Sequence, residues 1–160
     1  MSAKELYFRF TEKEIQGIVT LNEEHAPQTC SVLWEALKDP IRVQAMHAMF
    51  AGPEIMTGLP KSAQTFDPRT IPSENQTCYP SAGECLWFYQ GKNMMYGLTD
   101  ELWEIGMFYA DGGRINGPLG WTPCNIFGRM TDNLEAFAEE CADIRISGVK
   151  TLEIGRFLKA

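Results

Sequence analysis

Two well-separated stretches of the chain are predicted as α-helices, and a long, mainly strand-like region lies between them. The first is HAPQTCSVLWEAL (25–37), in which Pro27 stands where a first helical turn begins and apolar residues recur on one face. The second lies in TDNLEAFAEECADI (131–144), where Asp132 and Glu135 have the spacing of a helix-capping pair. Since strands and helices do not alternate, the pattern argues against a parallel doubly wound sheet. It favours an antiparallel β-barrel with helices at its ends.

Alternating and apolar runs around the two helices predict the strands of this barrel. KELYFRF (4–10) places alternate apolar residues on one side, and IQGIVTL (15–21) is typical of the returning strand of a hairpin. Residues 43–59 are compatible with a helix or with strands, and the pair Gly52-Pro53, which breaks a long helix, favours two short strands. After a long loop at residues 60–77, further strands are expected at GECLWFYQ (83–90), NMMYGL (93–98), WEIGMFYA (103–110), NIFGRM (125–130) and VKTLEIGRF (149–157).

The composition limits the kind of protein and its partners. At 160 residues the chain has the size of one domain, which we assign to residues 1–160. Its 14 basic and 21 acidic residues give a net charge of −7, which argues against nucleic acid or an anionic membrane surface as a partner. MSAKELYFRF (1–10) lacks the long apolar stretch of a signal peptide, so we expect a cytoplasmic location. Five cysteines without a C-x-x-C pair are typical of reduced thiols.

The order of these parts resembles the cyclophilin superfamily. A hairpin is followed by APQTC opening a helix, by two strands, and by a long loop that ends in EN before GECLWFY. NIFGRMTDNLEAF is similar to the cyclophilin segment in which an aromatic-glycine-basic strand leads into the second helix. HAPQTCSVLW, HAMFAGPE and ENQTCYPSAGE resemble more closely an uncharacterised bacterial family with a cyclophilin-like barrel. The resemblance implies a mainly β fold, a closed antiparallel β-barrel with two α-helices capping its ends.

The resemblance also raises prolyl isomerase activity, but the matching residues differ. In active cyclophilins the strand after the first helix carries an arginine that reaches the prolyl nitrogen, and a glutamine follows on the next strand. In AMHAMFAGPEIM (45–56), Met49 takes the place of that arginine and the glutamine has no match. Because a thioether cannot direct positive charge at the nitrogen, we expect the standard mechanism to be absent. Whether Arg114 or Arg129 replaces the arginine in space stays open.

Seven residues are candidates for a ligand-binding cleft. His47 and Glu54 fall on the two strands that flank the Gly52-Pro53 turn, where they would be polar anchors beside Met49. The alternative is a hydrogen-bonded core histidine and an exposed carboxylate. In the SENQT segment, Glu74 either lines the same cleft or is structural, and Asn75 is expected to hold the loop through backbone hydrogen bonds. The predicted cleft comprises His47, Met49, Glu54, Glu74, Trp87, Tyr89 and Trp121. Among the aromatic side chains, Trp121 is expected to be the most exposed, because it follows the glycine-rich segment NGPLG.

The remaining reactive side chains favour simpler roles. His25 and His47 have no ligand partner at metal-binding spacing, so we predict neither a metal site nor a cofactor. Cys124 in WTPCN has no neighbouring cation to activate a thiolate and is predicted to be a buried small residue. Glu101 and Glu104 are predicted to belong to a solvated acidic face.

The sequence therefore predicts a protein that binds a small molecule or a short peptide in a cleft beside Met49, without standard prolyl isomerase activity. Two alternatives remain. One is a peptidyl-prolyl isomerase with a substituted catalytic residue. The other is a structural or assembly protein, a homo-oligomer in which exposed Trp and Met side chains are buried at a subunit interface.

Overall fold

The computed structural model describes residues 2–160, and its strands run antiparallel throughout. The strands are β1 (Glu5–Phe10), β2 (Ile15–Leu21), β3 (Ile41–His47), β4 (Glu54–Gly58), β5 (Gln76–Thr77), β6 (Glu84–Gln90), β7 (Leu102–Phe108), β8 (Asn116–Gly117), β9 (Gly120–Trp121), β10 (Cys124–Asp132) and β11 (Lys150–Arg156). The helices are α1 (Pro27–Ala36) and α2 (Leu134–Ser147), with 3-10 turns at Lys61–Ala63 and Pro68–Thr70.

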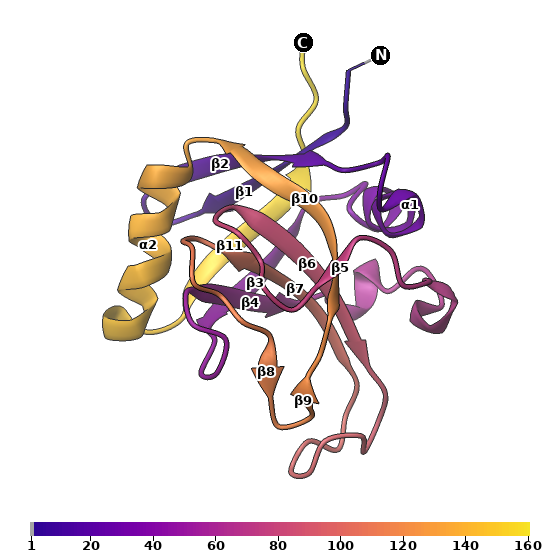
Figure 1. Cartoon of the computed structure of the whole chain (residues 1–160). Helices are drawn as coiled ribbons and strands as arrows, with labels where there is room; N and C mark the ends of the chain where they lie inside the picture. The colour runs from indigo at the N-terminus through magenta and orange to yellow at the C-terminus, as the bar shows by residue number, and fades with distance from the viewer. Residues whose placement is uncertain (1) are drawn as a thin grey trace.

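The sheet closes on itself. Its strand order is β2-β1-β11-β3-β4-β7-β6-β10, and β10 also pairs with β2, so that eight strands of the described chain form a barrel. β5 adds a short edge pairing to β10, and β8 and β9 form a separate hairpin that projects below the barrel in Figure 1. The predicted closed antiparallel barrel is confirmed, including the two short strands on either side of Gly52-Pro53.

The two helices lie on opposite sides of the barrel (Figure 1) and both contribute to one core. Cys30 and Leu33 of α1 are buried, as are Phe137 and Cys141 of α2. The ring of Phe137 stacks on Phe10 at a centroid distance of 4.7 Å. The amphipathic spacing seen in the sequence therefore corresponds to the faces that close the barrel.

Two local predictions were wrong. NMMYGL is a loop that holds only an isolated bridge between Met95 and Leu98, because Gly97 turns the chain with a φ of 86°. The expected capping pair of α2 does not form, since Asp132 is still the last residue of β10. Asn133 precedes the helix in a left-handed conformation and makes no side-chain cap.

The closure of the barrel depends on Gly128, where β10 passes between two neighbours. Gly128 pairs with Cys85 of β6 and with Leu21 of β2. A Cβ at this position would lie 2.8 Å from the carbonyl oxygen of Thr20 and 2.9 Å from Cγ1 of Val19. The first of these neighbours is backbone of the paired strand and cannot turn away, so the close approach of β10 to β2 requires glycine.

A charged cluster joins three strands on the outside of the barrel. The carboxylate of Glu153 on β11 accepts hydrogen bonds from Arg42 Nε at 2.8 Å, from Arg9 Nη2 at 2.9 Å and from the Tyr7 hydroxyl at 2.9 Å. The hydrogen bond from Arg42, with those from Arg9 and Tyr7, lowers the pKa of Glu153 to about 2. Arg9 and Arg42 are thus paired with Glu153, and the cluster stabilises the pairing of β1, β11 and β3.

Candidate functional site

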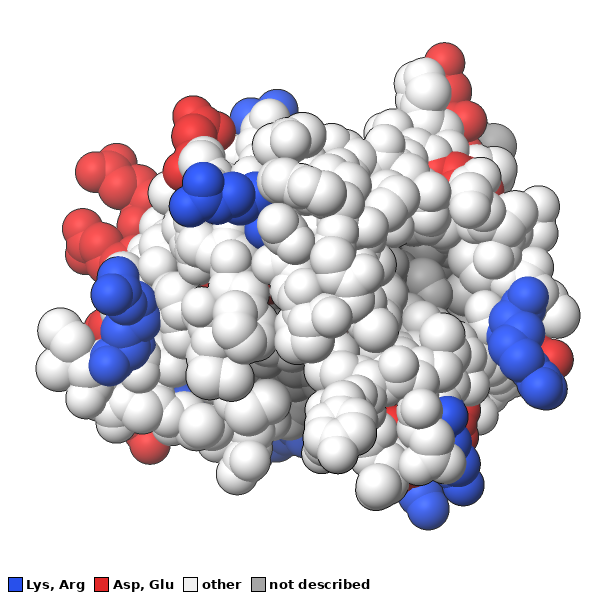
Figure 2. Space-filling view, turned by 60° about the horizontal axis from the view of Figure 1, so that its bottom comes forward, with Lys and Arg blue, Asp and Glu red and all other residues white. Residues whose placement is uncertain are grey.

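A cleft of about 460 Å³ opens on the outer face of the barrel, between the β3–β4 turn, strands β4, β6 and β7, and the β8–β9 hairpin. This volume is in the range of small-molecule pockets. Figure 2 shows this side of the molecule, which is hollowed near its centre and largely uncharged there, with Lys, Arg, Asp and Glu toward the periphery. The walls are mainly apolar and include Met46, Met56, Phe88, Leu102, Ile115 and Leu119.

Strand alternation places two carboxyl groups in this apolar cleft. Glu54 begins β4 and Glu104 lies on the adjacent β7. Their neighbours Ile55 and Ile105 point into the barrel core, so the two glutamates point outward. Glu54 is only 5% exposed and Glu104 only 8%, yet neither side chain has a hydrogen-bond or ion-pair partner among residues 2–160. Gly106 leaves room for the pair, because a Cβ there would overlap Glu54 Oε2.

Burial changes the protonation of both carboxyl groups. It raises the pKa of Glu104 to about 7. Burial, together with repulsion from Glu104, raises the pKa of Glu54 well above its usual range. Since burial and this repulsion both disfavour ionisation of the two groups together, the pair retains a proton near neutral pH. Such a pair is able to accept a cation, donate a hydrogen bond or exchange a proton with a ligand.

His47 lies at the edge of the cleft and its ring is held by two hydrogen bonds. Nδ1 lies 2.8 Å from the carbonyl oxygen of Ala48, and Nε2 lies 2.7 Å from the Tyr109 hydroxyl. Because a carbonyl only accepts, Nδ1 carries the hydrogen of the neutral ring and Tyr109 donates to Nε2. The structure thus brings His47 and Glu54 to one cleft, as predicted. The histidine ring is hydrogen-bonded, as the alternative interpretation had it, whereas Glu54 is buried.

Met49 lies at the mouth of the cleft but not on a strand. β3 ends at His47, and Met49 is 87% exposed in the turn that follows. The predicted match of Met49 to a strand position was therefore wrong, because the last hydrogen bond in register between the two strands is the one from Ala48 N–H to the carbonyl of Glu54, and Met49 already lies in the turn. Arg114 and Arg129 are exposed and neither lines the cleft.

Glu74 has a structural position away from the cleft. Its Oε1 accepts hydrogen bonds from the backbone N–H of Thr29 at 2.5 Å and from the Thr29 hydroxyl at 2.6 Å. The first turn of α1 has no cap of its own, since Ala26 stands at the N-cap, and a carboxylate is favourable there. Asn75 holds the same loop by donating to the Ile126 carbonyl at 2.9 Å, as predicted.

The aromatic candidates are not in the cleft either. Trp87 is 4% exposed inside the barrel, where it packs against Phe66. Trp121 is exposed on β9, as expected, beside the ring of Tyr79, but Tyr96 is the more exposed aromatic side chain, at 107% against 53%. The β8–β9 hairpin does reach the cleft, but through other residues such as Leu119.

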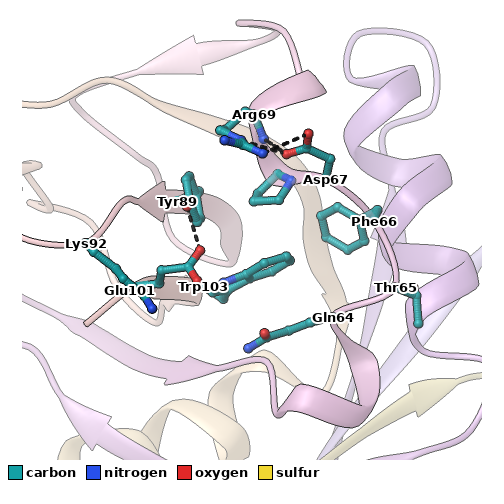
Figure 3. Close-up of a pocket in the computed structure, with 10 residues that line it drawn as sticks. Gln64, Thr65, Phe66, Asp67, Arg69, Tyr89, Lys92, Glu101 and Trp103 are labelled. Carbon is teal, nitrogen blue, oxygen red and sulfur yellow. Dashed lines mark hydrogen bonds and ion pairs between the residues drawn. The ribbon is translucent and has the colours of Figure 1, made fainter.

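Tyr89 lines a second hollow, on the opposite face of β6 and β7 (Figure 3). This hollow has a volume of about 710 Å³, and its walls combine Trp103 and Phe66 with charged side chains. The Tyr89 hydroxyl donates to Glu101 Oε2 at 2.6 Å, and this hydrogen bond raises the pKa of Tyr89. The seven predicted residues therefore divide among different places, and His47, Met49 and Glu54 share the cleft.

Glu104 was not among the predicted cleft residues. It was predicted to be solvated, and the structure shows it buried in the cleft. The available signal was the strand pattern, because Glu104 shares a face with Gly106 and Phe108 in an otherwise apolar strand. Cys124, which also lines the cleft, is 3% exposed as predicted, and burial raises the pKa of its thiol.

Metal-binding clusters, membrane-spanning helices and disulfides are absent from residues 2–160. Within 2–160 there is no group of three or more His, Cys, Asp or Glu arranged to hold a metal ion. No helix in that part of the chain is both long and apolar enough to cross a membrane. All five cysteines are free thiols.

A closed eight-stranded barrel over the described residues, with a helix at each end, is a cyclophilin-like fold. The chain belongs to the family described as "Protein of unknown function (DUF3830)", whose model matches residues 9–155. No curated protein matches the sequence significantly.

Solved structures share the fold at low sequence identity. McbB in complex with tryptophan is 16% identical with a TM-score of 0.66 over 97% of this chain, which spans 45% of the McbB chain. The cyclophilin of Mimivirus is 11% identical with a TM-score of 0.61, over 99% of this chain and 91% of its own. The hypothetical protein AF2241 from Archaeoglobus fulgidus is 18% identical with a TM-score of 0.54, over 97% and 95% of the two chains.

Proposed function

We propose that the protein binds a small, largely apolar molecule, or an apolar side chain of a short peptide, in the outer cleft. The observation that carries this proposal is an open, mainly apolar cleft of about 460 Å³ that contains two buried carboxyl groups. Apolar walls favour binding by about 25 cal/mol for each Å² removed from water, and a few fixed polar groups orient the ligand.

The same lining argues against the standard isomerase mechanism. That mechanism needs a positive donor at the prolyl nitrogen, which lowers the barrier of ~18–20 kcal/mol to amide rotation. No Lys or Arg stands among the described residues that line the cleft, and both ring nitrogens of His47 are already hydrogen-bonded. Binding without this chemistry is therefore the function that the site supports best.

Methionine methyl NMR tests the proposal with reporters that the chain already contains. Met46, Met49, Met56 and Met95 line the cleft, whereas Met107 and Met130 are buried elsewhere and are internal controls. On titration with 3-phenylpropan-1-ol, a neutral apolar probe, we expect the cleft methyl signals to shift and the control signals to stay.

A matched pair of variants locates the binding. Met56→Ala removes a half-buried wall of the cleft and is expected to weaken probe binding severalfold, because apolar contact area is lost. Met94→Ala changes an exposed methionine of the 91–100 loop that does not line the cleft and is expected to leave affinity unchanged. If no cleft methyl shifts at millimolar probe, the proposal is wrong.

Assembly is a second candidate, which one observation favours. Large apolar side chains remain exposed around the cleft mouth, among them Phe50 at 59%, Tyr96 at 107% and Trp121 at 53%. Burying them against a second copy would form a homo-oligomer. Light scattering measures this directly, and a monomer at micromolar concentration would contradict it.

A further inference from the structure

Among residues 2–160, no cationic side chain pairs with the two carboxyl groups of the cleft. Both are more than nine-tenths buried and reach the cleft surface. Arg145 lines an adjoining hollow together with His47 and Met49, not the cleft itself. Unpaired buried carboxyl groups destabilise a folded protein, so their presence in a cavity open to ligands points to a partner that comes from outside.

We propose that the cleft selects ligands that carry a protonated amine, with the ammonium group held by Glu54 and Glu104 and the apolar body along the surrounding walls. This inference rests on the function proposed above and specifies the class of ligand. Met56, Phe88 and Leu102 flank the carboxyl groups on the same outer face of β4, β6 and β7 and would contact the apolar body.

The floor of the cleft, formed by Glu54, Glu104 and Gly106, suits an ammonium group. An ammonium has three donors and no acceptor, whereas the two carboxyl groups offer unused acceptor oxygens. Gly106 lies beneath Glu54 Oε2 and carries no side chain that would block it. An anionic ligand would meet repulsion in the same place, and a neutral ligand would leave the carboxyl groups unpaired.

The titratable groups on the elements around Glu54 and Glu104 are consistent with selectivity for an ammonium group. Glu54 of β4 and Glu104 of β7 lie on the same outer face of the two paired strands, and Cys124 of β10 and His47 of β3 line the same cleft. Burial keeps the Cys124 thiol protonated at neutral pH, since it raises the pKa of that group. A bound ammonium stabilises the ionised forms of both glutamates, so binding is expected to release a proton near neutral pH.

Three probes of similar size and different charge test the inference on the wild-type protein. 3-Phenylpropylamine is expected to shift the cleft methionine methyls with an affinity at least about tenfold higher than 3-phenylpropan-1-ol near pH 8, because charge-assisted hydrogen bonds form only with the amine. 3-Phenylpropanoate is expected to bind more weakly than the alcohol. Calorimetry of the amine in two buffers of different ionisation enthalpy measures the released proton.

The Glu54→Gln/Glu104→Gln variant provides the matched control. It keeps the shape of the floor and removes its charge, so the preference for the amine is expected to disappear while the alcohol still binds. The methyl signals of Met107 and Met130 report whether the variant is folded, and Glu104→Gln alone replaces it if they change.

The outcomes separate the two proposals. Equal affinity of wild-type protein for the amine and the alcohol overturns the inference and leaves the proposed function in place. Absence of methyl shifts with all three probes overturns both. An amine preference that survives in the charge-free variant also contradicts the role of the two glutamates.

Discussion

The Glu54→Gln/Glu104→Gln variant is expected to be about 2–4 kcal/mol more stable than the wild type near pH 8 and equally stable near pH 4. In the unfolded chain these carboxyl groups ionise at their ordinary pKa of 4.5, whereas in the folded protein burial raises the pKa of Glu104 to about 7 and that of Glu54 also upward. The folded state therefore binds more protons between these values, and wild-type stability falls as the pH rises through them. Above about pH 7 the part of this loss that comes from Glu104 is complete.

Urea denaturation at both pH values measures this difference. The comparison near pH 4 is the internal control, because glutamine resembles a protonated glutamate and other titrating groups, such as Glu153, affect both proteins equally. A stability difference that is the same at the two pH values would show that the glutamates titrate normally, and the electrostatic description of the cleft would then be wrong.

Gly128→Ala is expected to destabilise the protein by about 3 kcal/mol or more, because a Cβ cannot enter the contact between β10 and β2 without separating the strands. The nearest atom is the backbone oxygen of Thr20 at 2.8 Å, so rotation of a side chain does not relieve the clash. Since this pairing closes the barrel, we expect the substitution to lower the free energy of global unfolding and not only that of a local region. Thermal and urea unfolding measure it.

Gly58→Ala is the matched strand control. Gly58 is exposed at the end of β4, and its Cβ would lie 3.7 Å from the carbonyl oxygen of Trp103, which is an ordinary contact. We expect a change within about 1 kcal/mol of wild type, because alanine also reduces the freedom of the unfolded chain. Equal effects of the two substitutions would contradict the role of Gly128 in closure.

The strands and helices that could be predicted are those with a clear local sequence pattern. The alternation in residues 4–10 and 83–90 corresponds to β1 and β6, and the Pro27 helix start corresponds to α1. The predictions failed where a local signal was overridden. Residues 93–98 are apolar enough for a strand but turn at Gly97, and Asp132 remains in a strand although its spacing is that of a helix cap.

The candidate site could be predicted only in part. His47 and Glu54 were brought together because the Gly52-Pro53 turn is local and holds the two flanking strands side by side. Glu74 and Glu104 look alike in the sequence, as polar residues beside loops or strands. One is bound by the N-terminus of α1, and the other lies beneath apolar side chains in the cleft.

The sequence by itself determined the periods, the turns and the order of elements, because each depends on neighbours within a few positions along the chain. Only the tertiary structure decided which face of β4 and β7 is covered. The β8–β9 hairpin and the 91–100 loop, distant from β4 along the chain, contribute walls around Glu54 and Glu104. The burial of a carboxyl group, and with it the raised pKa, is set by such non-local packing, and no single stretch of the sequence contains it.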